Sequence, residues 1–225
     1  IDLSKTGVSD QMLAEANKIF FVACGTASHA GHVGKYVVEN LARVSVEVDI
    51  ASEFRYRKPI LSKDTLVIVI SQSGETADTI AAMREAKNQG LKVLAITNVK
   101  GSTISREADA VIYTQAGMEI SVASTKAYIT QLLVIYLLAI RIAQIKGQIS
   151  ESKASELLAE LKAIPEKAKQ LLDSKESVQR FAARRFRDKS TFFIGRGMDY
   201  ALAMEASLKL KEVSYVHSEA YAAGE

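Results

Sequence analysis

Six consecutive residues, Ser71 to Thr76, have the side chains and the spacing to bind an anion (SQSGET). They offer three hydroxyls and one amide, and Gly74 lets the backbone approach a ligand closely. An apolar run at 65–70 precedes this serine turn and apolar residues at helical spacing follow it, so the turn lies between a strand and a helix. Free backbone amides and the positive end of the helix dipole meet at such a place. The sequence therefore predicts an anion site or, as the plainer alternative, an ordinary helix N-cap.

The serine turn lacks the glycine and lysine patterns that bind nucleotides. Neither G-x-x-x-x-G-K-[ST] nor G-x-G-x-x-G occurs there. A turn with hydroxyls and no lysine suits a single phosphate monoester, such as that of a phosphosugar. A second turn of small residues, at 24–28, follows another apolar run at 19–23. Because the carboxyl ends of parallel strands share one edge of a sheet, both turns would face one crevice, which favours a phosphate site over two separate caps.

Strands and helices alternate around these two turns. Short helices are expected at 9–18, 51–57 and 102–108, and longer ones at 28–43 and from Thr76 onward. This alternation predicts an α/β fold with a doubly wound five-stranded parallel sheet, in the flavodoxin-like three-layer α/β/α arrangement. The five predicted strands lie at 19–23, 44–50, 65–70, 92–97 and 110–113.

The second half of the chain begins with helices and then repeats the opening pattern. Helices are expected at 124–146, at 150–173 with a brief interruption at Pro165, and at 176–188; we expect them to cover the first sheet. Residues 191–197 then resemble 19–25 at an offset of 172, which indicates an internal duplication. We therefore expect a complete first unit (1–150), a helical connection (151–188) and an incomplete second unit (189–225) with an unpaired edge.

Composition excludes several classes of protein. The net charge is only +3 and the basic residues are scattered, so we expect no nucleic-acid partner. The most apolar helix contains Thr130, Gln131 and Arg141, so it is predicted to be a core helix and not a membrane span. One cysteine and the absence of a visible signal peptide favour the cytoplasm. His29 and His32 lack further ligands nearby, so no metal and no cofactor are predicted.

Several runs together resemble the sugar isomerase (SIS) family. The run at 71–79 (SQSGETADT) resembles its phosphosugar-binding signature, and the match extends over nearly the whole chain. Within the family the chain is most similar to the isomerase half of the enzymes that make amino sugars. That closer likeness depends on the runs CGT at 24–26, SEFRYR at 52–57, AG at 116–117 with EI at 119–120, VASTKA at 122–127 and EAYAAGE at 219–225.

The resemblance implies which residues bind the substrate. Ala27 stands where the family pattern has serine, so one hydroxyl contact is missing from this chain. The implied phosphate ligands are Thr26, Ser71, Gln72, Ser73 and Thr76, and the residues implied to line the sugar are Val122, Ala123 and Ser124.

The resemblance also implies a catalytic pair on a helix expected at 199–215. Lys209 and Glu212 are three residues apart, which places them on one helical face. From the residues alone, a surface ion pair of little energetic value is the favoured interpretation. The resemblance implies that Glu212 is the base that carries a proton between neighbouring sugar carbons, and that Lys209 is its cationic neighbour. Glu205 and Lys211 are expected to be structural.

The activity implied by the resemblance is conversion of fructose 6-phosphate to glucosamine 6-phosphate in a cytoplasmic homodimer. Ammonia would come from a separate glutaminase domain. The family also uses a ring-opening histidine and a Schiff-base lysine that lie outside these residues, so the chain alone is expected to bind phosphosugars weakly and to turn over little. Two alternatives stay open: a phosphosugar-binding regulatory module, and another phosphosugar isomerase or deglycase.

Overall fold

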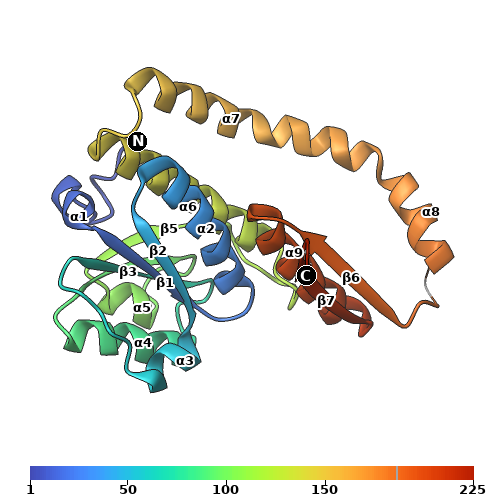
Figure 1. Cartoon of the computed structure of the whole chain (residues 1–225), viewed down its shortest axis with the longest axis horizontal. Coiled ribbons are helices and arrows are strands. Elements are labelled where there is room, and N and C mark those ends of the chain that lie inside the picture. The colour runs from blue at the N-terminus through green and yellow to red at the C-terminus, as the bar shows by residue number, and fades with distance from the viewer. Residues whose placement is uncertain (186) are drawn as a thin grey trace.

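A parallel sheet forms the first unit of the chain. The computed structural model describes residues 1–185 and 187–225 (Figure 1). Within this part of the chain the larger sheet has five strands in the order β2-β1-β3-β4-β5, all parallel. The direction of winding reverses between β1 and β3, so a crevice is expected at their carboxyl ends. The doubly wound sheet is confirmed, with strands β1 (Lys18–Ala23), β2 (Ser45–Ile50), β3 (Thr65–Ser71), β4 (Lys92–Thr97) and β5 (Ala110–Tyr113).

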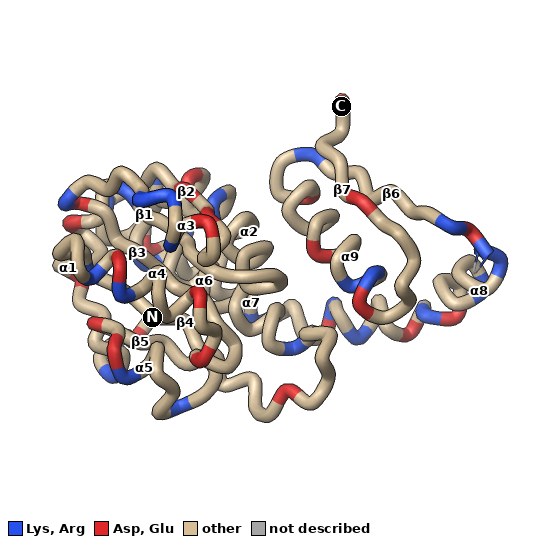
Figure 2. The backbone as a smooth tube through the Cα atoms, turned by 90° about the horizontal axis from the view of Figure 1, so that it is seen from below, with Lys and Arg blue, Asp and Glu red and all other residues tan. Residues whose placement is uncertain are grey.

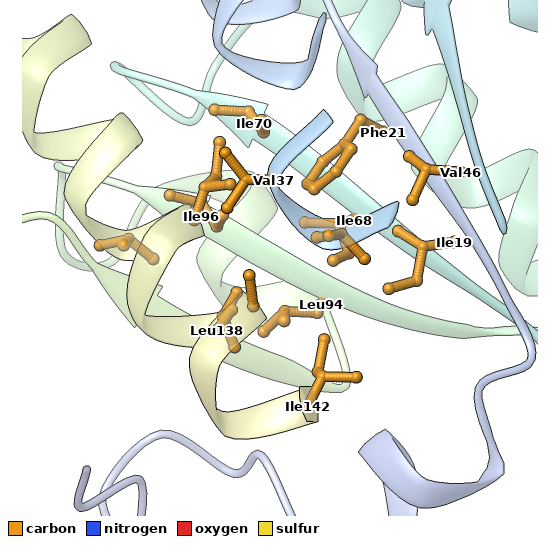
Figure 3. Close-up of a cluster of buried hydrophobic side chains, with 14 of the residues drawn as sticks. Ile19, Phe21, Val37, Val46, Ile68, Ile70, Leu94, Ile96, Leu138 and Ile142 are labelled. Atoms are coloured by element: carbon orange, nitrogen blue, oxygen red, sulfur yellow. The ribbon is translucent and has the colours of Figure 1, made fainter. Parts of the chain in front are cut away.

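The central strands β1, β3 and β4 are buried on both faces, which explains why they are nearly continuous apolar runs, whereas the edge strand β2 alternates and is partly exposed. Every residue of β3, in the middle of the sheet, is buried. Neighbouring residues of a strand point to opposite faces. Phe21 and Ile68 therefore join a cluster under α2 (Thr26–Ala42) and α6 (Lys126–Ile145) (Figure 3). Phe20 and Val67 join a second cluster under α3 (Ala51–Arg57) and α4 (Ala77–Asn88).

Helices cover the two faces of this sheet. Ser9 caps the first of them by accepting a hydrogen bond from the backbone N of Met12 (3.1 Å). α6 is long and apolar enough to cross a membrane by length and composition alone. In the structure it packs on α2 and contributes to the core, as predicted. The helices of the first unit are α1 (Asp10–Glu15), α2 (Thr26–Ala42), α3 (Ala51–Arg57), α4 (Ala77–Asn88), α5 (Thr103–Glu107) and α6 (Lys126–Ile145).

Two further helices, α7 (Glu151–Asp173) and α8 (Lys175–Arg185), lead away from the sheet (Figure 1). The predicted interruption at Pro165 is wrong, because α7 continues through it. A proline removes one backbone donor, and this exposed turn lets water bond to the freed carbonyl. The expectation that both helices cover the sheet is also wrong: among described residues α7 buries only Ala154 and α8 buries none. Because α7 stays helical, its second half passes beyond the sheet.

The second unit repeats the beginning of the first. Its strand β6 (Ser190–Gly195), helix α9 (Met198–Ser214) and strand β7 (His217–Ala222) have the bounds of β1, α2 and β2 shifted by 172 residues. The parallel register is shifted by the same amount. The glycines before the two helices also match, with φ 54° and ψ −132° at Gly25 and φ 59° and ψ −126° at Gly197. The offset of 172 found in the sequence therefore also holds for the bounds and the register of these three elements.

One face of the second sheet is open to solvent. In the first unit Phe20 and Val22 pack under α3 and α4. Their counterparts Phe192 and Ile194 are 58% and 68% exposed. The ring of Tyr221 lies beside that of Phe192, with 5.8 Å between the centroids.

The two units also differ little in charge pattern, since basic and acidic residues are interspersed along both (Figure 2).

Candidate functional site

The serine turn has a compact geometry set by its own hydroxyls. β3 ends at Ser71, and α4 begins directly after Thr76. The two hydroxyls of these residues are 3.0 Å apart. Ser71 Oγ also accepts a hydrogen bond from the backbone N of Gly74 (3.0 Å), and Ser73 Oγ accepts one from Glu75 N (3.1 Å). The donor groups predicted from the sequence therefore lie together at the carboxyl edge of the sheet.

A cavity of about 300 Å³ opens beside the serine turn. We call it the main cavity because it lies beside the serine turn, although other cavities among the described residues are larger. It lies at the carboxyl ends of β1 and β3, where the winding of the sheet reverses. Every phosphate ligand implied by the resemblance lines it, as do two of the three residues implied to line the sugar; Ala123 does not. Their roles stay predictions. The lining residues are Cys24, Thr26, Ala27, Ile70, Ser71, Gln72, Ser73, Thr76, Glu119, Ser121, Val122, Ser124 and Gln131.

The wall opposite the serine turn is a loop that leads into α6. Val122 in this loop is 97% exposed. Glu119 Oε2 accepts a hydrogen bond from the backbone N of Ala127 (3.0 Å), in the first turn of α6. A carboxylate at a helix N-terminus is stabilised by the free amides and the helix dipole. Glu119 thereby fixes the loop to α6 and holds the loop beside the main cavity.

Side chains of α9, in the second unit, reach the wall of the main cavity. Lys209 Nζ donates a hydrogen bond to Thr26 Oγ1 (2.9 Å) and forms an ion pair with Glu212 Oε2 (2.5 Å). The side chain of Glu212 is 30% exposed and does not line the cavity. Lys209 and Glu212 lie on one face of α9, as their spacing predicts. Glu212 is thus connected to the cavity wall through Lys209 and Thr26.

Glu205 connects the two units more closely than the sequence suggested. Glu205 is buried, with 6% of the residue exposed. Its carboxylate accepts one hydrogen bond from Thr26 Oγ1 (3.1 Å) and a second from His29 Nδ1 (2.7 Å). Lys209 Nζ lies 3.4 Å from the same carboxylate. The hydroxyl hydrogen of Thr26 therefore points at Glu205 and must change partner before it can be donated to a phosphate. Glu205 was expected to be structural, and no sequence pattern signalled these contacts.

Burial and nearby charge shift several pKa values around the site. Burial, with the charges of His29 and Lys35, lowers the pKa of His32, which favours its neutral form. Burial and then the Glu205 carboxylate raise the pKa of Tyr128, so its phenol stays protonated. A hydrogen bond from the backbone N of Thr103 (2.7 Å) lowers the pKa of Glu75, next to the serine turn.

Three polar residues of the cavity, Glu119, Ser121 and Gln131, were not predicted as site residues, and Glu119 was noted only in a run that carries the family resemblance. Gln131 was noted only as a polar residue in an apolar helix. That position is itself a signal, since a polar side chain buried among apolar ones needs a partner. Ser121 lies in an exposed loop, and its sequence context carries no such signal.

The fold and the site define the class of this protein. Residues 12–141, more than half of the chain, match the SIS domain family. The chain therefore belongs to the SIS domain family.

Several aminotransferases resemble this chain over its whole length or nearly so. The glutamine–fructose-6-phosphate aminotransferase (isomerizing) of Caldanaerobacter subterraneus subsp. tengcongensis is 60% identical over all 225 residues, and that of Clostridium tetani is 59% identical. In both cases the chain spans 37% of the length of the relative. The solved C-terminal domain of glucosamine-fructose-6-phosphate aminotransferase from Francisella tularensis is 39% identical, with a TM-score of 0.94 over 96% of this chain and 61% of that one.

Proposed function

We propose that the chain is the isomerase part of an enzyme that makes glucosamine 6-phosphate from fructose 6-phosphate and glutamine-derived ammonia. The observation that carries the proposal is the main cavity, in which a hydroxyl-lined turn at a helix N-terminus meets Thr26 and, through it, Lys209. The identity to aminotransferases over the whole chain supports the choice of reaction. The complete enzyme would include a glutaminase domain and act as a cytoplasmic homodimer.

The residues of the site divide the work between binding and proton transfer. The serine turn would hold the phosphate with backbone amides and hydroxyls, aided by the dipole of α4. Converting a ketose to an aldose moves a proton between two neighbouring carbons, which requires a base. Glu212 is the proposed base, and its ion pair with Lys209 (2.5 Å) places it next to the cation that faces the cavity wall. The Lys209 ammonium would stabilise negative charge on the sugar oxygens.

Binding of phosphosugars tests this proposal directly. By calorimetry, the 225-residue chain should bind fructose 6-phosphate and glucosamine 6-phosphate weakly, and unphosphorylated fructose not at all. Thr76→Val removes a hydroxyl of the serine turn with little change of shape, and affinity should fall about tenfold, the effect of one charge-assisted hydrogen bond. Thr130→Val is the matched control, since that hydroxyl donates to the Ala127 carbonyl of its own helix (3.0 Å).

Two outcomes would contradict the proposal. If the folded chain gave no heat with either sugar phosphate, the binding role of the serine turn would be wrong. If the chain alone isomerised fructose 6-phosphate rapidly, the site could not depend on residues outside it. A regulatory phosphosugar module would bind the same ligands but would need no base at Glu212. Glu212→Gln in the full-length protein would then change neither phosphosugar binding nor any activity of that protein. Loss of isomerisation in that variant distinguishes the enzyme from the module.

A further inference from the structure

Gln131 is a buried polar residue on the wall of the main cavity. It lies on α6, its residue exposure is 2%, and its Oε1 has no hydrogen-bond partner among the residues that the structure describes. Two other buried oxygens, Thr97 Oγ1 and Tyr128 OH, also lack a partner there, but neither residue lines this cavity. Gln131 therefore combines an unsatisfied, buried oxygen with a place on the wall of a cavity that a ligand can fill.

Leaving a buried amide without a partner is unfavourable, so a ligand that supplies one gains affinity. The serine turn and Gln131 differ in what they can accept. The turn presents O–H and N–H donors, which suit a phosphate dianion. A sugar hydroxyl can donate to the oxygen of Gln131 and accept from its NH₂ group, so it satisfies the amide in either orientation, whereas a phosphate dianion can only accept. The two sides of the cavity thus match the two parts of a phosphosugar.

We propose that Gln131 positions the carbon chain of the phosphosugar by bonding to one of its hydroxyls while the phosphate lies on the serine turn. This inference rests on the proposed function, because it needs the phosphate to be held at that turn. Gln131 adds selectivity for a polyhydroxylated phosphate ester over phosphate itself. It contacts no reacting atom in this role, so it is a positioning residue.

Two probes separate this role from a general effect on the site. Binding of fructose 6-phosphate and of inorganic phosphate is measured by calorimetry on the 225-residue chain and on Gln131→Met, which keeps the side-chain volume and removes the amide. The dissociation constant for fructose 6-phosphate should rise five- to tenfold, as expected for one lost hydrogen bond. The constant for inorganic phosphate should not change. Gln144→Met makes the same change on α6 away from the cavity and should alter neither constant.

Each other result overturns the inference in a recognisable way. Equal losses for both probes would mean that Gln131 acts on the serine turn and not on the sugar. No loss for either probe, with a higher melting temperature, would mean that the amide is only a structural defect. If the wild-type chain bound neither probe, the proposed function would fall as well. Gln131→Asn, which shortens the amide by one carbon, provides the same comparison if the methionine variant does not fold.

Discussion

The serine turn has its shape because one residue in it has no side chain. Gly74 has φ +67°, a left-handed conformation that other residues rarely adopt. A Cβ built there would lie 2.1 Å from Ser102 Oγ and 2.6 Å from Ser102 Cβ. The carbonyl of Gly74 also accepts a hydrogen bond from Ile104 N (3.1 Å) in α5. The turn is therefore held against α5 so closely that only glycine fits.

Replacing this glycine should disturb both stability and binding. We expect Gly74→Ala to lower the free energy of unfolding by about 2–4 kcal/mol, from backbone strain and from the clash with Ser102. Gly90→Ala separates the two causes, because Gly90 has φ +78° but nothing within 4 Å of its Cβ position. That control should lose only about 1 kcal/mol. Urea unfolding measures both; equal losses would show that the close approach to Ser102 does not matter.

At the scale of single residues, the sequence predicted the parts of the site that are close together in the chain. The serine turn was recognisable because its donors occupy six consecutive positions between a strand and a helix. The contacts of Glu205 were not, because its partners Thr26 and His29 are 179 and 176 residues away. Such contacts depend on how two helices pack, and neither helix sequence specifies that alone. The roles of all the predicted site residues, Ala123 and Glu212 among them, stay predictions.

At the scale of elements, α2 and α9 form the junction between the units. Thr26 and His29 on α2 face Glu205 and Lys209 on α9. Lys209 has two carboxylate neighbours on its own helix, one buried and one partly exposed. Because burial strengthens hydrogen bonds to a charged group and water screens them, the two carboxylates should differ in their contribution to stability.

Two neutralising substitutions on α9 test this difference. Glu205→Gln should destabilise the chain by about 1–3 kcal/mol, because it weakens charge-assisted hydrogen bonds to both Thr26 and His29. Glu212→Gln, the matched control on the same helix, should cost less than about 1 kcal/mol, as for other partly exposed ion pairs. Chemical denaturation followed by circular dichroism compares them. A larger loss for Glu212→Gln would mean that α9 is not held by the buried carboxylate.

Most elements could be predicted from periodicity and turn chemistry. Four apolar runs and one alternating stretch, at 44–50, predicted the five strands of the first sheet, and the offset of 172 anticipated β6, α9 and β7. The failures concern α7 and α8. Their apolar positions, among them Leu171, Val178 and Phe181, suggested helices packed on the sheet, yet these side chains are 65–75% exposed. An amphipathic pattern shows that a helix has an apolar face but not which surface that face meets.

At the scale of the whole molecule, the open face of the second sheet is the feature that most favours aggregation. Phe192, Ile194 and Tyr221 are exposed on one sheet, and exposed apolar residues on a short sheet favour association between chains. We propose that residues 1–150 fold alone. Compared with that shorter chain, the 225-residue chain should be less soluble and should show more light scattering at equal concentration.

A double substitution provides the control for this prediction. Phe192→Ser with Ile194→Ser in the 225-residue chain should restore solubility to the level of residues 1–150, since it removes the apolar groups and leaves the length unchanged. Equal solubility and equal melting temperatures for the original long and short chains would contradict the prediction. If residues 1–150 were more soluble but the double variant were not, the cause of the low solubility would lie in α7 and α8 instead.

The contact between Thr26 and Lys209 makes the two halves of the molecule thermodynamically interdependent. The hydroxyl of Thr26, on the wall of the cavity, accepts a hydrogen bond from the Lys209 ammonium of α9. A ligand that binds more tightly when this contact is formed also stabilises the contact between α2 and α9. The free energy is the same in both directions, because coupling between two equilibria is reciprocal. Whatever loosens α9 from α2 would therefore lower the affinity for such a ligand. A filled cavity in turn resists separation of the units.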